Sequence, residues 1–157
     1  MKGILFILLV FTFSSCSVLG VKTEPVALEQ KETYDVSSIE QLASYYTEAR
    51  IGDFIESDHF VIDTAIVYRN NLYVNVKHSG GCKDHDYEFI GSPAVMKSNP
   101  PKRSVMFVHN NRGDECEMWI SKTIEVDLRE LSLTKTKGSE ITLLLQNYDY
   151  PITYIYQ

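Results

Sequence analysis

Alternation of apolar and polar side chains between residues 59 and 78 constrains the fold of this chain more than any other sequence feature. Every second residue over 60–68 is apolar or threonine, and the alternation resumes over 72–76. A period of two places these side chains on one face of a half-buried strand. Asn70 and Asn71 lie between the two runs and readily adopt left-handed turn dihedrals. Residues 59–78 are therefore predicted to form a β-hairpin.

The rest of the chain continues in short strand-like segments bounded by glycine, proline and asparagine. Five further strands are predicted at 85–90, 103–109, 117–126, 139–146 and 151–156. With the hairpin they make about seven strands, and no helices alternate with them. This pattern predicts a mainly β fold, either an antiparallel sandwich of the immunoglobulin-like kind or a barrel. The chain shows no repeat of 20–50 residues, so a propeller or a solenoid is not expected.

One helix is predicted before the strands. Ser37 or Ser38 can cap its first turn, and Gly52 ends the pattern. Between them, apolar residues recur at helical spacing, at Ile39, Leu42, Tyr45 or Tyr46, and Ala49. We expect residues 37–157 to form a single β-rich domain that begins with this amphipathic helix.

The first residues indicate export from the cytoplasm. Lys2 is followed by an almost unbroken apolar run over 4–13 and then by two serines. The run is about half of the roughly 20 residues that a transmembrane helix needs, so a cleaved signal peptide over 1–15 is the favoured interpretation.

The segment Phe13-Ser14-Ser15-Cys16 resembles the lipobox of bacterial lipoproteins, with Phe13 in place of the leucine that this family prefers. The resemblance implies that Cys16 carries fatty acids such as palmitate and anchors the protein to a membrane of the bacterial cell envelope. Several acyl chains make a durable anchor, whereas one chain binds only marginally. Residues 16–36 are then a lipidated tether. Ordinary cleavage that releases a soluble protein is the alternative.

Lipid attachment at Cys16 leaves Cys82 and Cys116 as an even pair. Exported proteins meet an oxidising environment, so these two cysteines are predicted to form a disulfide. Such a bond closes a loop of about 35 residues, which stabilises the folded state by roughly 3.5 to 4 kcal/mol in the chain-entropy model.

Both cysteines lie in a segment that also contains three of the four histidines. Strand parity places His85, His109 and Cys116 facing inward. We expect the disulfide with the two rings packed beside it, and no cofactor. The alternative is a zinc or copper site with the ligands Cys82, His85, His109 and Cys116, because two sulfurs and two imidazoles suit these metals. A calcium site is a third possibility, although no calcium-binding loop motif is present. Its ligands would be Asp84, Asp86, Asp114, Glu115 and Glu117.

Two motifs in this segment, Gly80-Gly81-Cys82-x-x-His85 and Asp114-x-Cys116-Glu117, are similar to those of an uncharacterised group of secreted bacterial domains. The similarity covers roughly residues 78–128 and implies a recurring β domain without a known activity. The loops around the cysteines also offer a candidate recognition surface, made of Asp84, Asp86, Asn110, Asn111, Asp114 and Trp119.

The composition and the absence of certain motifs argue against several classes of function. A net charge of -6 without a basic run argues against nucleic-acid binding, because Lys and Arg must neutralise phosphates. The chain has no phosphate-binding glycine loop, no nucleophile-elbow serine and no HExxH pair. We therefore expect a non-catalytic binding or structural domain that contacts the membrane through its lipid and a protein or glycan through its surface. A metal-binding envelope lipoprotein is the alternative function.

Overall fold

The structure is a computed structural model, and it describes residues 36–157. The predicted signal peptide over 1–15, the lipid attachment at Cys16 and nearly all of the tether lie outside the described residues. Within 36–157 no helix has both the length and the apolar character needed to cross a membrane.

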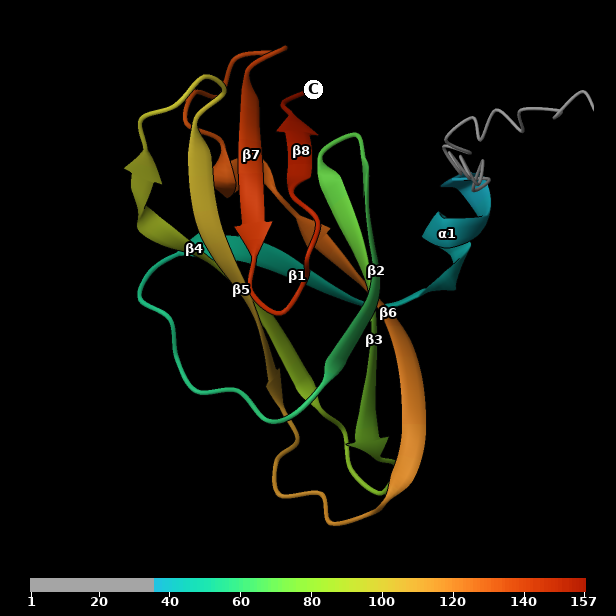
Figure 1. Cartoon of the computed structure of the whole chain (residues 1–157). Helices are drawn as coiled ribbons and strands as arrows, with labels where there is room; N and C mark the ends of the chain where they lie inside the picture. The colour runs from blue at the N-terminus through green and yellow to red at the C-terminus, as the bar shows by residue number, and fades with distance from the viewer. Residues whose placement is uncertain (1–35) are drawn as a thin grey trace, which may run out of the picture. The chain divides into compact units, whose positions relative to one another are not determined.

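Eight strands and one short helix make up the described chain (Figure 1). The helix α1 spans Val36–Leu42, and a 3-10 turn covers Arg129–Leu131. The strands are β1 Ala43–Ile51, β2 Val61–Tyr68, β3 Asn71–Gly80, β4 Asp86–Met96, β5 Lys102–Asn110, β6 Met118–Asp127, β7 Glu140–Leu145 and β8 Ile152–Ile155. The mainly β class with one N-terminal helix is confirmed, and so are the hairpin and the five further strands predicted from the sequence.

The strands follow the order β2-β3-β6-β1-β4-β5-β7-β8. Residues 43–48 of β1 pair with β6, and residues 49–51 pair with β4. β1 therefore joins two halves of the sheet, which face each other across the core (Figure 1). The outer strands β2 and β8 approach each other, so the sandwich is almost closed into a barrel. The pairing is mixed, because β1 is parallel to both of its neighbours and β5 is parallel to β7.

The predicted helix ends at Leu42, and the segment predicted as its second half is strand β1 instead. The apolar residues of this segment satisfy both periods: they are spaced for a helix, but Ala43, Tyr45 and Ala49 also share one face of a strand. Tyrosine, threonine and isoleucine favour strands, and β6 and β4 both offer unpaired backbone groups to this segment. Tertiary pairing therefore decides against the longer helix.

The hairpin turn also differs in detail from the prediction. Arg69 and Asn70 make the turn, and Arg69 takes the left-handed conformation, with a φ of 55°. Asn71 is already the first residue of β3. Asn70 holds the turn against the end of the chain, because its Oδ1 accepts hydrogen bonds from Tyr154 Oη at 2.9 Å and from the Gln157 backbone N–H at 3.0 Å.

The core is made of the inward side chains of both halves. It contains Leu72, Val74 and Val76 of β3, Phe89 of β4, Phe107 of β5, Val126 of β6 and Leu143 of β7. At the end of the sandwich where β3 and β5 finish, this apolar core gives way to three buried histidines.

Candidate functional site

Three histidines and one aspartate lie buried together at this end of the sandwich. His78 lies near the end of β3, His85 precedes β4, and His109 is near the end of β5. Asp114 lies in the loop between β5 and β6. The three rings are 0%, 4% and 2% exposed, and Asp114 is 8% exposed. The antiparallel register of β4 and β5 brings them together, because it pairs Tyr87, two residues after His85, with His109.

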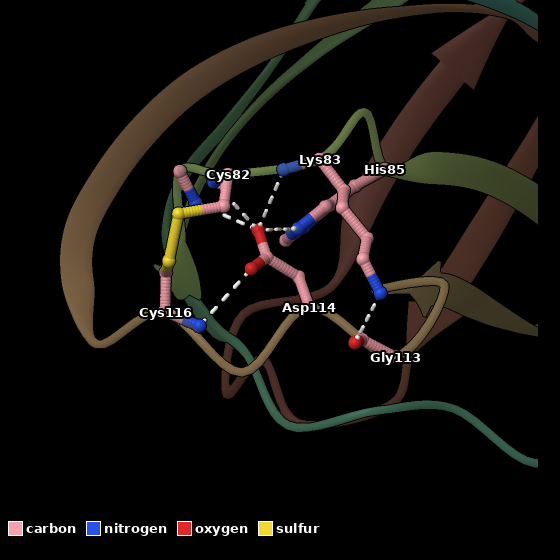
Figure 2. The surroundings of a disulfide bond; sticks show 7 residues. Cys82, Lys83, His85, Gly113, Asp114 and Cys116 are labelled. Atoms are coloured by element: carbon pink, nitrogen blue, oxygen red, sulfur yellow. Dashed lines mark hydrogen bonds and ion pairs between the residues drawn. A yellow bond between two sulfur atoms is a disulfide. The ribbon is translucent and has the colours of Figure 1, made fainter.

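Cys82 and Cys116 form a disulfide beside this cluster (Figure 2). Their Cα atoms are 6.0 Å apart, which lies within the range for this bond, so the predicted pairing is confirmed in the structure. The bond ties the loop after β3 to the loop before β6. It lies nearer the surface than strand parity suggested: Cys82 is exposed and Cys116 is half-buried, because Cys116 precedes β6 and is not one of its inward residues.

The Asp114 carboxylate binds the backbone of both loops. Its Oδ2 accepts hydrogen bonds from the N–H groups of Gly81 at 2.9 Å, Cys82 at 2.9 Å and Lys83 at 3.0 Å. Its Oδ1 accepts one from Cys116 N–H at 3.0 Å. These bonds, led by the one from Cys116, hold the Asp114 pKa well below its usual range. Asp114 is therefore an ionised, buried anchor, and its assignment to the exposed recognition surface is wrong.

The histidine rings extend this network into the protein. His85 Nε2 lies 3.2 Å from Asp114 Oδ2, as Figure 2 shows, and His85 Nδ1 lies 2.8 Å from His109 Nε2. Burial, together with the neighbouring His78 and His85 rings, lowers the pKa of His109 to about 4. His109 is thus a neutral imidazole at neutral pH. Its Nδ1 is buried and has no hydrogen-bond partner among the described residues.

His78 is the member of the cluster that sequence reasoning missed. Its Nδ1 lies 2.9 Å from Ser79 O, and its Nε2 lies 2.7 Å from Tyr87 Oη. Burial lowers the pKa of His78 and raises that of Tyr87 to about 12, so the phenol stays protonated and can donate to the ring. Parity was the available signal, because His78 shares the inward phase of Leu72, Val74 and Val76.

Gly80 makes room for the His85 ring. A Cβ atom at this position would lie 2.7 Å from His85 Nε2, and Gly80 has a φ of 147°, which disfavours other residues. Gly80 therefore permits close approach between the loop and the ring, whereas Gly81 leaves room for the Met118 side chain.

Most polar residues of the predicted recognition surface form hydrogen bonds or ion pairs with neighbouring residues at this end of the sandwich. Asp86 forms an ion pair with Arg112, with an Oδ1–Nη2 distance of 2.6 Å. The Oδ1 atoms of Asn110 and Asn111 accept hydrogen bonds from the backbone two residues further on. Asp84 is exposed, and Trp119 is 60% exposed beside the exposed Met118. These three residues form the accessible rim of this end.

The structure brings together only part of the predicted Cys82, His85, His109 and Cys116 metal set. The two sulfurs are bonded to each other, so this oxidised form offers no thiolate ligands. His85 and His109 do lie together, and His78 joins them. Of the carboxylates considered for calcium, Asp114 is engaged by backbone N–H groups and Asp86 by Arg112.

The fold and the bridged loops define a small β-sandwich domain with a disulfide-closed end. Residues 43–156 match the family described as the NigD-like C-terminal beta sandwich domain, and the chain belongs to this family. The resemblance to a group of bacterial β domains is confirmed at this level. No curated protein matches the chain.

Two solved structures are similar to this chain. The first is a NigD-like immunity protein from Bacteroides caccae, with a TM-score of 0.55, 16% identity, and coverage of 70% of this chain and 58% of the other. The second is a putative toxin-related protein from Parabacteroides distasonis, with a TM-score of 0.48, 18% identity, and coverage of 69% and 60%. The chain thus spans less than two thirds of either structure. At this identity, the first likeness shows the fold alone.

Proposed function

We propose that this protein is a lipid-anchored component of the bacterial envelope whose β sandwich is a non-catalytic, immunity-like module that binds another protein. The observation that carries the proposal is the end of the sandwich where a disulfide and a buried carboxylate hold two loops below an exposed rim. The Bacteroides caccae relative, which is described as an immunity protein, supports the immunity-like role.

The disulfide supports export. Such bonds form and persist in oxidising compartments and are rare in the cytoplasm. The signal-like segment over 1–15 and the lipobox-like segment ending at Cys16 agree with this location. An exported chain with Cys16 at its mature N-terminus leaves Cys82 and Cys116 to pair with each other, as they do in the structure.

The rim has features of a protein-binding surface. Trp119 and Met118 are 60% and 62% exposed on β6, next to the bridged loops. Tryptophan and methionine are enriched at protein interfaces, and a rigid surface loses less conformational entropy on binding. Glycan binding through Trp119 is the alternative partner class, since an aromatic ring can also stack on a sugar.

The anchor is tested by labelling cells with a palmitate analogue. The wild type should incorporate the label and fractionate with membranes, whereas Cys16→Ser should lose the label and accumulate as uncleaved precursor. A Cys82→Ser/Cys116→Ser variant is the matched control, because it removes the other two cysteines and should still be labelled. Labelling that survives Cys16→Ser would refute the anchor.

The binding rim is tested by a photo-crosslinking residue placed at position 118, beside the intact Trp119, in living cells. We expect a discrete protein adduct there, and none at position 133, where Leu133 is similarly exposed at 57%. Cells that carry Trp119→Ala should also lose protection against secreted proteins of related strains, whereas Leu133→Ala cells keep it. Equal crosslinking at both positions, or an adduct removed by glycosidase, would contradict the proposal.

A further inference from the structure

We propose that His78, His85 and His109 form a binding site for one divalent transition-metal ion, with zinc as the first candidate. This inference concerns the buried cluster and does not depend on the proposed binding rim or on lipid attachment. It also differs from the metal set expected from the sequence, because it uses His78 and neither cysteine.

The three rings already lie close enough to share an ion. One nitrogen from each ring lies within 4.8 Å of the others, and His85 Nδ1 and His109 Nε2 are 2.8 Å apart. Tetrahedral zinc with Zn–N bonds of about 2.0 to 2.1 Å needs nitrogens roughly 3.4 Å apart. Small rotations of the three rings therefore suffice to reach that geometry.

Two of the rings are oriented from outside in the way that metal-bound histidines usually are. His85 Nε2 faces the Asp114 carboxylate, and His78 Nδ1 faces the carbonyl oxygen of Ser79. Both oxygens can only accept, so these nitrogens carry the ring protons and the opposite nitrogens present lone pairs. A carboxylate or carbonyl behind the ring is the usual outer partner of a histidine ligand.

The third ring, His109, has a buried nitrogen that metal binding would satisfy. Because His85 holds its proton on Nε2, the 2.8 Å contact between the two rings requires the proton of His109 on Nε2. That tautomer leaves His109 Nδ1 as a buried acceptor without a hydrogen-bond partner among the described residues. A metal ion bound by the inner nitrogens lets His109 carry its proton on Nδ1, on the side of the backbone of His59. The ion would thus relieve the one unsatisfied polar atom of the cluster.

The donor chemistry selects the class of metal. Three imidazoles suit zinc, copper and nickel, whereas magnesium and calcium prefer oxygen ligands. Asp114 adds one buried negative charge behind His85. An ion on His78 Nε2 would replace the hydrogen bond that this nitrogen now accepts from Tyr87 Oη at 2.7 Å, and would leave the phenol oxygen beside the ion as a fourth ligand. The bridged cysteines supply no thiolate, so the site does not compete with the disulfide.

The test uses the purified, oxidised full chain in detergent, freed of metal with a chelator and titrated with zinc chloride. Calorimetry and native mass spectrometry should show one zinc ion per chain. His78→Gln, His85→Gln and His109→Gln should each abolish this binding, and Asp114→Asn should weaken it about 10- to 100-fold through the lost outer partner. His59→Gln is the matched control, because His59 is the exposed fourth histidine and should leave the affinity unchanged.

A measurement on the wild type keeps the proposal falsifiable where a variant fails to fold. One equivalent of zinc should shift the ring ¹⁵N resonances of three of the four histidines and leave His59 unmoved. Zinc should also raise the melting temperature of the wild type. Absence of stoichiometric binding, binding that persists in a folded His109→Gln variant, or resonance shifts confined to His59 would each overturn the proposal.

Discussion

The two ends of the sandwich are closed in different ways (Figure 1). At the end where the β2–β3 turn meets the C-terminus, Asn70 makes the closing hydrogen bonds, and its carbonyl oxygen also accepts from Leu128 N–H at 2.8 Å. At the other end a disulfide, a buried carboxylate and three buried imidazoles lie between the loops. The closing hydrogen bonds of the first end come from backbone and neutral side-chain groups, with the Asp127–Arg129 ion pair beside them. The second end contains a covalent bond and a cluster of buried imidazoles around a buried carboxylate.

This difference indicates which end carries more than a structural role. Ordinary hydrogen bonds are sufficient to close a β sandwich, as the Asn70 end shows. The histidine end adds buried polar groups whose desolvation costs free energy, and within residues 36–157 it gives His109 Nδ1 no hydrogen-bond partner. Buried titratable groups with shifted pKa values cluster at functional sites. If the two ends also differ in energy, the histidine end should contribute more to the free energy of unfolding than the Asn70 end.

Loss of the disulfide should have the largest effect. Cys82→Ala/Cys116→Ala releases a closed loop that joins residues 34 positions apart, and the chain-entropy model gives a loss of roughly 4 kcal/mol in unfolding free energy. Urea unfolding followed by tryptophan fluorescence measures this loss. Reduced wild type should match the variant. A loss below about 1 kcal/mol would mean that Asp114 and the strands hold this end without the bond.

Acidification should have the second-largest effect, and it should act at the histidine end. The folded pKa of His109 is lowered to about 4 from an ordinary value of 6.5, so the unfolded chain binds more protons between these values. Its contribution is fully present above pH 6.5 and is lost as the pH falls toward 4, by roughly 3 kcal/mol. Urea unfolding across this range, in the presence of a chelator, measures the slope. His109→Gln should flatten it, and an unchanged slope would show that His109 is not buried neutral.

Local patterns in the sequence predicted the strands of both ends. Alternation identified the hairpin and the later strands, because side-chain period is a property of neighbouring residues. Pairing of Cys82 with Cys116 followed from cysteine number and compartment, and parity placed His85 and His109 inward. These features depend on the geometry of neighbouring residues or on the number of cysteines, and both can be obtained from the sequence alone.

The remaining features depend on contacts between distant segments. Residues 43–51 fit a helix and a strand equally well, and only pairing with β6 and β4 decides between them. The parallel pairs have no local signature. Asp114 reads as an ordinary solvated loop residue, because the backbone N–H groups that it binds come from a loop more than 30 positions earlier in the chain. The sequence thus predicted the location of the site, its disulfide and two of its histidines, but neither the part played by His78 nor the buried position of Asp114.

The same Asp→Asn change at each end allows a direct comparison of the two ends. Asp114→Asn places an amide N–H₂ where a carboxylate oxygen accepts from backbone N–H groups or from His85, and we expect a loss of about 2 kcal/mol. Asp127→Asn is the matched change at the other end, where the carboxylate pairs with the 56% exposed Arg129. Asp127 is itself buried, but its partner guanidinium is exposed and can turn to water, so the expected loss is smaller, about 1 kcal/mol. Urea midpoints at equal m-values compare the two variants, and equal losses would contradict the difference between the ends.

The hydrogen bonds of Asn70 should contribute less than the Asp114 carboxylate does. Asn70→Ala removes the acceptor of Tyr154 Oη and of Gln157 N–H, and Tyr154 is fully buried, so its hydroxyl is left without this partner. We expect a loss of about 1 to 2 kcal/mol. Tyr154→Phe removes the hydroxyl itself, so a double-mutant cycle isolates the pair, with an expected coupling of about 1 kcal/mol. Thermal and urea unfolding of the four proteins measures it. Zero coupling would mean that packing of β2 against β8 closes this end, and that hydrogen bonding at Asn70 only follows from that packing.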